Sequence, residues 1–117
     1  MDWKYLFTSF EGRINRGKWW AGFGVTVAVM VVASIIDNLL GTTFQGLPYG
    51  WVYLIAAIAF LYFGLALYTK RWHDRNKSGW WTLIGLVPII GGIWILVELG
   101  ILEGTKGANQ YGPDPLG

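Results

Sequence analysis

Three long apolar runs, separated by short polar segments, make up most of this chain. Residues 19–36 and 51–69 contain no charged side chain, and residues 80–102 contain only one, Glu98. As helices these runs are about 27–35 Å long, which matches the roughly 30 Å hydrocarbon core of a bilayer. They lack the alternating pattern of membrane β-strands. The pattern therefore predicts three transmembrane helices, near residues 19–40, 51–69 and 80–102.

The short segment ahead of the first run is amphipathic. Trp3, Leu6, Phe7 and Phe10 are spaced i, i+3, i+4 and i+7, so they share one helical face. Such a face suits either the membrane interface or packing against the helix bundle, and the sequence leaves both open. We expect residues 1–18 to form a short amphipathic helix followed by a basic turn.

The third run and the segment after it contain helix-breaking residues. Pro88 and the pair Gly91-Gly92 predict a kink near the middle of the third helix. Residues 103–117 are rich in Gly, Pro and Asn, which predicts a flexible tail. The expected fold class is all-α. It is a helical integral membrane protein with three transmembrane helices in one domain, residues 19–102, preceded by the amphipathic N-terminal helix.

The composition agrees with a membrane protein and limits its chemistry. Hydrophobic residues make up 54% of the chain and charged residues 14%, whereas a typical soluble domain has about 25% charged residues. The absence of cysteine excludes disulfides and thiolate metal sites. A single histidine without clustered carboxylates lacks the ligands of a zinc site. We therefore expect neither a metal nor a cofactor.

Lysine and arginine are distributed unevenly along the chain. Eight of the nine lie in residues 1–18 and in the loop 70–79, and none lies in the connection 41–50. By the positive-inside rule, the N-terminus and loop 70–79 face the cytoplasm of a multi-pass plasma-membrane protein. Three spans would place the C-terminal tail on the outer face. A re-entrant hairpin at residues 88–92 would instead return the tail to the cytoplasm.

The most distinctive polar segment is residues 70–81. It combines four cations, the only histidine and three tryptophans between two apolar runs. A similar order, in which basic residues precede a tryptophan pair, leads into the first run. Because indole rings prefer the headgroup region, we expect both pairs to anchor the protein at the interface. These anchors are Trp19, Trp20, Trp80 and Trp81.

The arginines of the two basic segments are candidates for binding an anionic headgroup or a protein partner. Guanidinium groups match phosphate geometry, and basic pockets on the cytoplasmic side bind anionic headgroups. The simpler interpretation is that these cations only orient the protein. The candidate site comprises Arg13, Arg16, Arg71, His73, Asp74, Arg75 and Ser78. Nucleic acid is not an expected partner, because the basic residues adjoin the membrane and the tail is not basic.

Two carboxylate-containing groups suggest other functions. His73 and Asp74 are the only pair suited to proton chemistry, but their spacing places no nucleophile beside them, so we expect no enzyme. Asp37 and Glu98, near the ends of the first and third runs, would support an alternative. This alternative is an oligomeric transport element for a small solute or an ion, with both carboxylates in one aqueous pocket.

A family resemblance rests on a set of motifs spread along the chain. They are Phe10-x-Gly12-Arg13-x-x-Arg16-x-x-Trp19, Arg71-x-His73-Asp74-x-x-x-Ser78-Gly79-Trp80-Trp81, Pro88 and Asn109-x-Tyr111-Gly112-Pro113. With these residues the chain resembles the small bacterial inner-membrane proteins grouped as domain of unknown function 805. The resemblance covers nearly the whole chain and implies a compact multi-span inner-membrane protein, without implying an activity. The chain departs from the expected pattern at Trp72 and Gln110, where a smaller apolar residue and Arg are usual.

The expected function is that of a non-enzymatic accessory or interaction protein of the bacterial inner membrane. Its cytoplasmic cluster of basic and aromatic residues would bind anionic lipid headgroups or a membrane-protein partner. A second copy of the chain is one such partner.

Overall fold

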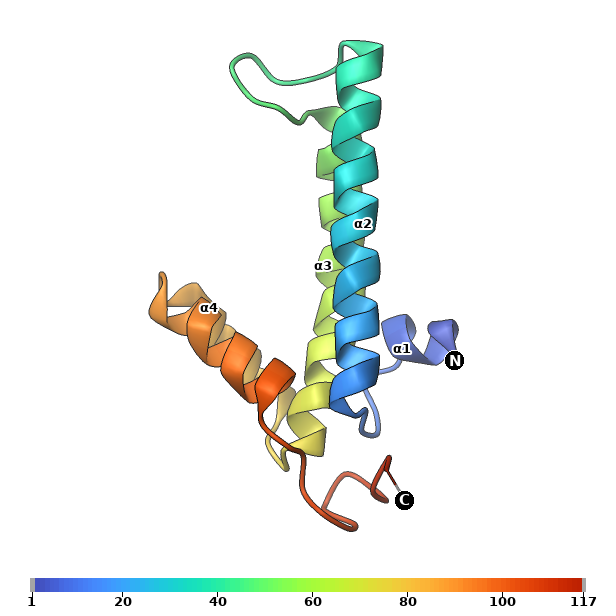
Figure 1. The fold of residues 1–117 in the computed structure, drawn as a ribbon, viewed down its shortest axis with the longest axis vertical. Helices are drawn as coiled ribbons and strands as arrows, with labels where there is room; N and C mark the ends of the chain where they lie inside the picture. Colours follow the sequence, from blue (N-terminus) through green and yellow to red (C-terminus); the bar gives the residue numbers. More distant parts are fainter. Residues whose placement is uncertain (1, 117) are drawn as a thin grey trace.

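The computed structural model describes residues 2–116, which form helices, turns and loops without a β-strand. Two long antiparallel helices stand side by side, and a shorter hairpin leans away from them near one end (Figure 1). We call this end of the pair, which contains residues 16 and 74, the base. The short N-terminal helix α1 (Trp3–Thr8) and the C-terminal tail also lie there. The all-α class predicted from the sequence is confirmed.

The long helices are α2 (Arg16–Leu40) and α3 (Trp51–Asp74). Among the described residues, only these two helices are long and apolar enough to cross a membrane. The Asn15 side chain accepts the backbone N–H of Lys18 and caps the start of α2. Gly41, with a φ of 70°, adopts the left-handed conformation that ends the helix. The first two predicted runs are therefore helical, but α3 extends one turn further, into the charged segment expected to be a loop.

A buried carboxylate closes the connection between α2 and α3. Asp37 is fully buried, and its two carboxylate oxygens accept four hydrogen bonds. The donors are the Thr42 hydroxyl at 2.5 Å and the backbone N–H groups of Gly50, Val52 and Tyr53 at 2.9, 3.0 and 2.9 Å. The first N–H groups of a helix lack partners within the helix and attract negative charge. Asp37 therefore determines where α3 begins.

The third apolar run folds as a hairpin of two short arms. The first arm is the 3₁₀-helix η1 (Gly79–Leu86), and the second joins α4 (Ile90–Ile95) to the π-helical turn η2 (Leu96–Ile101). Pro88 lies between the arms, where it lacks the N–H that a continuous helix would use. The prediction of one continuous helix over residues 80–102 is therefore wrong. The chain forms the hairpin that was considered as its alternative.

Close backbone contact holds the two arms together. A Cβ atom added to Gly91 would lie 1.8 Å from the carbonyl oxygen of Ile84, so only glycine fits at this position. Between the arms Ile89 has a φ of 66°, a conformation that is unfavourable for a β-branched residue. The packing of the arms must compensate for this local cost.

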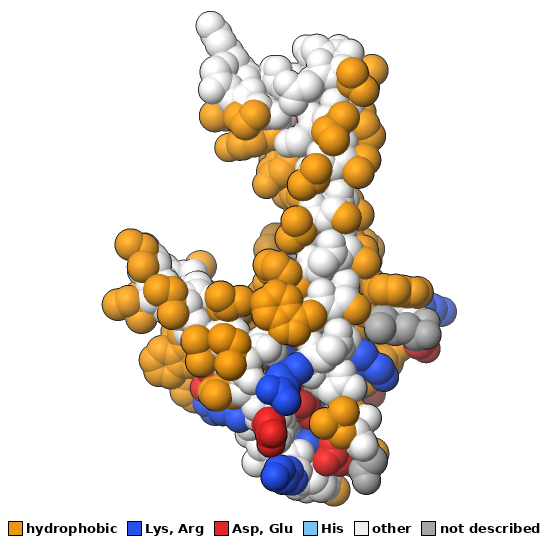
Figure 2. Space-filling model, viewed as in Figure 1, with side chains coloured by type: hydrophobic (Ala, Val, Ile, Leu, Met, Phe, Trp, Pro, Cys, Tyr) orange, Lys and Arg blue, Asp and Glu red, His pale blue; other side chains and the backbone are white. Residues whose placement is uncertain are grey.

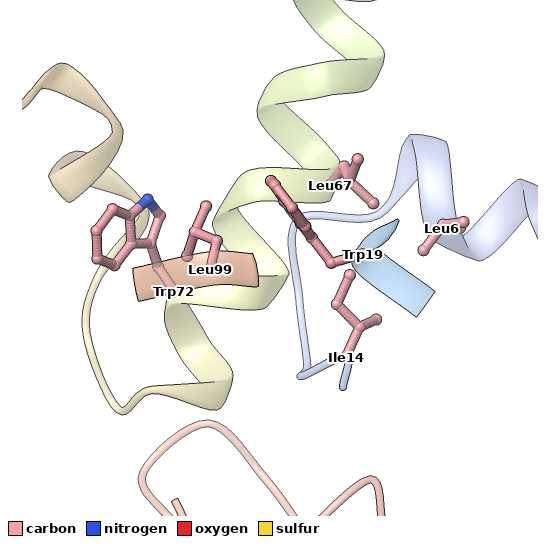
Figure 3. Close-up of a cluster of buried hydrophobic side chains, with 6 residues drawn as sticks. All are labelled: Leu6, Ile14, Trp19, Leu67, Trp72 and Leu99. Carbon is pink, nitrogen blue, oxygen red and sulfur yellow. The ribbon is translucent and has the colours of Figure 1, made fainter. Parts of the chain in front are cut away.

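A small hydrophobic core lies at the base, where the elements meet (Figure 3). Its members come from α1, the segment before α2, both long helices and η2. They are Leu6, Ile14, Trp19, Leu67, Trp72 and Leu99. Further from the base α2 and α3 bury few residues, and most of their apolar side chains remain exposed. The core thus positions the polar groups at the base, while the outer parts of the two helices present an apolar surface.

We expect Asp37→Asn to destabilise the helix pair by about 2–3 kcal/mol, because an amide offers one acceptor oxygen where four donors require two. Thermal unfolding of the detergent-purified protein, followed by circular dichroism, measures this loss. Asp2→Asn is the matched control, since Asp2 caps α1 and Asn caps a helix equally well. An unchanged melting temperature for Asp37→Asn would contradict the assigned role.

Candidate functional site

Charged side chains gather at the base, and several of them are buried. Figure 2 shows the blue and red side chains at this end, whereas the upper part of the visible face is hydrophobic or uncharged. The buried members are Arg13, Lys70, Arg71, Asp74 and Glu98. A buried charge is costly unless it is paired and hydrogen-bonded. The partners of these groups therefore explain how the base is built.

Asp74, in the last turn of α3, is shared by two arginines. One carboxylate oxygen accepts hydrogen bonds from the Arg13 guanidinium at 3.0–3.1 Å. The other accepts a hydrogen bond from the Arg71 guanidinium at 2.5 Å. All three side chains are almost fully buried. We call these three residues the ion triad. It joins the segment before α2 to the end of α3.

Asp74 carries one negative charge, whereas Arg13 and Arg71 together carry two positive charges. Backbone carbonyls of the tail and the hairpin accept the remaining hydrogen bonds of the two guanidinium groups. Arg13 donates to the carbonyls of three tail residues, and Arg71 donates to two carbonyls at the end of the hairpin. The acceptors of Arg13 are Thr105, Gly107 and Gly112, at 2.5, 2.7 and 3.1 Å. Those of Arg71 are Leu99 and Leu102, at 2.7 and 2.6 Å. The ion triad therefore holds both the tail and the hairpin against α3.

The tail also packs on His73. The rings of His73 and Tyr111 stack with centroids 3.8 Å apart, and the Asn109 amide donates to the His73 carbonyl at 2.8 Å. On the other side His73 Nδ1 lies 2.9 Å from the carbonyl oxygen of Gly12 and must carry a hydrogen, because a carbonyl only accepts. We expected residues 103–117 to be flexible, but the structure places the described part of this segment against the base.

Glu98 connects the hairpin to the chain just after α3. It accepts Arg75 Nε at 3.0 Å and Lys77 Nζ at 2.6 Å. Burial opposes ionisation of Glu98, but the bonds from Lys77 and Arg75 outweigh it and lower the pKa of this carboxyl. The carboxylate is therefore a structural partner of two cations. It anchors the π-helical turn η2 to the base.

The structure separates the two carboxylates of the transport alternative. Asp37 binds the first residues of α3, whereas Glu98 pairs with residues just after its last turn. Because α3 has 24 residues, its two ends are about 36 Å apart. Glu98 therefore lies at the base and not beside Asp37, and the expectation of a shared pocket is wrong.

Lys70 is a buried member of the base that the sequence analysis did not single out. It is fully buried, and its ammonium donates to the backbone carbonyls of Leu6, Ser9 and Ala66. It also lies 5.1 Å from the centre of the Tyr5 ring. These contacts dock α1 onto α3. No pattern in the sequence marks Lys70 as buried, because lysine is rarely buried without a charged partner.

The other predicted site residues are more dispersed. Arg75 is occupied by Glu98, and exposed Arg16 donates to the Ile101 carbonyl at 2.6 Å. Ser78 precedes η1 and lies with His73 along a separate groove. The predicted arginines thus bind carboxylates and carbonyls of the protein itself. They do not converge on one open phosphate site.

His73 and Asp74 are not assembled as an acid–base pair. The imidazole Nδ1 binds the carbonyl of Gly12, while the carboxylate binds Arg13 and Arg71. Within residues 2–116, no three histidine or acidic side chains lie close enough together to hold a metal ion.

The four tryptophans expected at the interface divide into two kinds. Trp19 is buried in the core, so its assignment as an interface anchor is wrong. Trp20 is 41% exposed, and its indole N–H donates to the Gly100 carbonyl at 2.8 Å. Trp80 and Trp81 are exposed on the first arm of the hairpin. These three rings remain available to the headgroup region.

We expect Asp74→Asn to destabilise the protein by about 3–5 kcal/mol, because it leaves two buried guanidinium groups without a counter-charge. The measurement is thermal unfolding in detergent, followed by tryptophan fluorescence. Glu103→Gln removes one acidic charge at an exposed position whose side chain forms no ion pair within residues 2–116, and it serves as the control. Equal melting temperatures for the two variants would refute a central role for Asp74.

Several known proteins resemble this chain over nearly its whole length. The family model described as "Protein of unknown function (DUF805)" matches residues 7–113. Inner membrane protein YhaH of Escherichia coli K12 is 33% identical over 98% of this chain and 97% of its own length. Inner membrane protein YhaI of the same strain is 36% identical over 93% of this chain and 87% of its own length. No solved structure matches the chain. The chain therefore belongs to the DUF805 family.

Proposed function

We propose that this protein is a non-enzymatic interaction protein of the inner membrane that crosses the bilayer twice and keeps both ends of the chain in the cytoplasm. Its base binds anionic headgroups of the cytoplasmic leaflet. One observation carries the proposal, namely the separation of charge between the two ends of the helix pair.

All nine lysines and arginines belong to the base or to the segments packed on it, together with six of the seven acidic residues. The remaining acidic residue, Asp37, lies at the opposite end, where it is buried and hydrogen-bonded. Transmembrane proteins keep lysine and arginine on the cytoplasmic side. This distribution supports a cytoplasmic base, and it is more one-sided than the sequence alone indicated, because the tail returns to the base.

The hairpin is suited to entering one leaflet without crossing the membrane. Its apolar second arm, Ile90–Ile101, has only the length of a short helix, about 18 Å against a hydrocarbon core of about 30 Å. Leu86 and Ile89, at the turn, are 79% and 80% exposed. Such exposed apolar side chains favour lipid over water. Two spans and a hairpin would place the tail in the cytoplasm, rather than on the outer face as three spans would require.

The exposed cations of the base provide the headgroup contacts. Lys4, Arg16, Lys18 and Lys106 are exposed at the base. Within residues 2–116 none of them forms an ion pair. Cations beside a membrane are attracted to anionic lipids by about 1 kcal/mol each. The buried arginines support this surface indirectly, because they hold the tail and the hairpin in place.

Single-cysteine labelling tests the topology, since the natural chain contains no cysteine. Gln45 in the α2–α3 connection and Ala108 in the tail are both exposed. We expect a membrane-impermeant maleimide to label Gln45→Cys in spheroplasts, and to label Ala108→Cys only after permeabilisation. The cysteine-free parent is the control. Labelling of Ala108→Cys in intact spheroplasts would contradict the two-span arrangement.

Replacing two surface cations tests headgroup binding. We expect the double variant Lys18→Gln, Lys106→Gln to bind an anionic phospholipid about thirtyfold more weakly, since each cation contributes about 1 kcal/mol. Titration of the detergent-solubilised protein with phosphatidylglycerol, followed by native mass spectrometry, measures the affinity. The variant Lys18→Arg, Lys106→Arg keeps both charges and should bind normally. Equal affinity for the Gln and Arg variants would overturn the proposal.

A further inference from the structure

An apolar groove of about 490 Å³ runs between α3 and the first arm of the hairpin. Leu65 and Thr69 of α3 line one wall, and Trp80 and Leu83 of η1 line the other. The volume falls within the range of roughly 300–1,000 Å³ that is typical of small-molecule sites. The groove is separate from the ion triad, and none of the contacts described above fills it.

The two ends of the groove differ in polarity. At the base end its lining includes the stacked rings of His73 and Tyr111. Towards the far end the lining becomes apolar, with Leu65 two turns earlier on α3. The distance along α3 from Leu65 to His73 is about 12 Å, close to the roughly 15 Å depth of one leaflet's hydrocarbon. A lipid of the leaflet at the base has the same order, with a polar head at the base and an acyl chain above it.

The chemistry of the lining distinguishes between lipid classes. Among the described residues that line the groove, none is Lys, Arg, Asp or Glu. The groove therefore offers no charge that would select an anionic headgroup. The lining instead contains the aromatic rings of Phe10, Trp80 and Tyr111, and the faces of such rings attract ammonium groups. These features favour a zwitterionic phospholipid.

We infer that the groove binds one acyl chain of a zwitterionic phospholipid, with the ammonium headgroup near the His73–Tyr111 stack. The leaflet concerned, the cytoplasmic one, rests on the orientation proposed above. Occupation of the groove itself depends neither on that orientation nor on the surface lysines.

Photo-crosslinking of the full chain in nanodiscs tests this inference. The probe is phosphatidylethanolamine with a diazirine in one acyl chain, at low fraction in a mixture of phosphatidylethanolamine and phosphatidylglycerol. Mass spectrometry of peptides should find the label concentrated on the groove walls. Leu65→Trp and Leu83→Trp, which fill the groove from opposite sides, should each reduce groove labelling at least fivefold. Ile55→Trp changes an exposed residue of α3 outside the groove and should leave the labelling unchanged.

Three results would overturn the inference. The first is labelling spread evenly over the exposed apolar residues of α2 and α3. The second is unchanged groove labelling in both Leu65→Trp and Leu83→Trp, since two separate variants guard against a folding defect in one. The third is equal groove labelling by a phosphatidylglycerol probe. Full labelling in the Lys18→Gln, Lys106→Gln variant is expected, so failure of surface headgroup binding remains distinguishable from failure of the groove.

Discussion

Asp74 pairs with both Arg13 and Arg71, and this buried ion triad connects the tail and the hairpin to the long helices. Removing three charges from water is expensive, and mutual attraction alone does not offset that cost. The carbonyls of the tail and the hairpin supply the remaining hydrogen bonds. The ion triad can therefore form only when both segments are docked, and both segments stay docked because the ion triad forms. This mutual requirement joins every part of the chain at the base.

With nearly all charged groups at one end, the remainder of α2 and α3 is left as an apolar pair whose exposed surface suits lipid. The hairpin begins and ends at the base, held by Arg71 and Glu98. It therefore reaches only part of the depth that the long helices span. The space between the hairpin and α3 remains as a groove.

The motifs that carry the family resemblance acquire a common explanation. Arg13, Arg71, Asp74 and the tail residues Asn109 and Tyr111 are far apart in the sequence, yet they contact one another or adjacent backbone at the base. Judged only from their neighbours in the sequence, such residues would be read as charged loop residues and residues that form turns. In the structure they are instead the groups that hold three chain segments together.

The all-α class and the two long apolar helices α2 and α3 follow from the sequence alone, as does the grouping of eight of the nine cations in residues 1–18 and 70–79. These properties depend on apolar length and on charge summed along the chain, and not on which residues are in contact. The hairpin of residues 80–102, which the sequence predicted as a third helix, required the folded structure, because an apolar run is compatible with both shapes until Gly91 contacts the other arm. The partners of Asp74, Glu98 and Lys70 were likewise decided by folding. A buried charge is stabilised by whichever donor or acceptor is nearby in space, and for Arg13 and Asp74 that partner is 61 residues away.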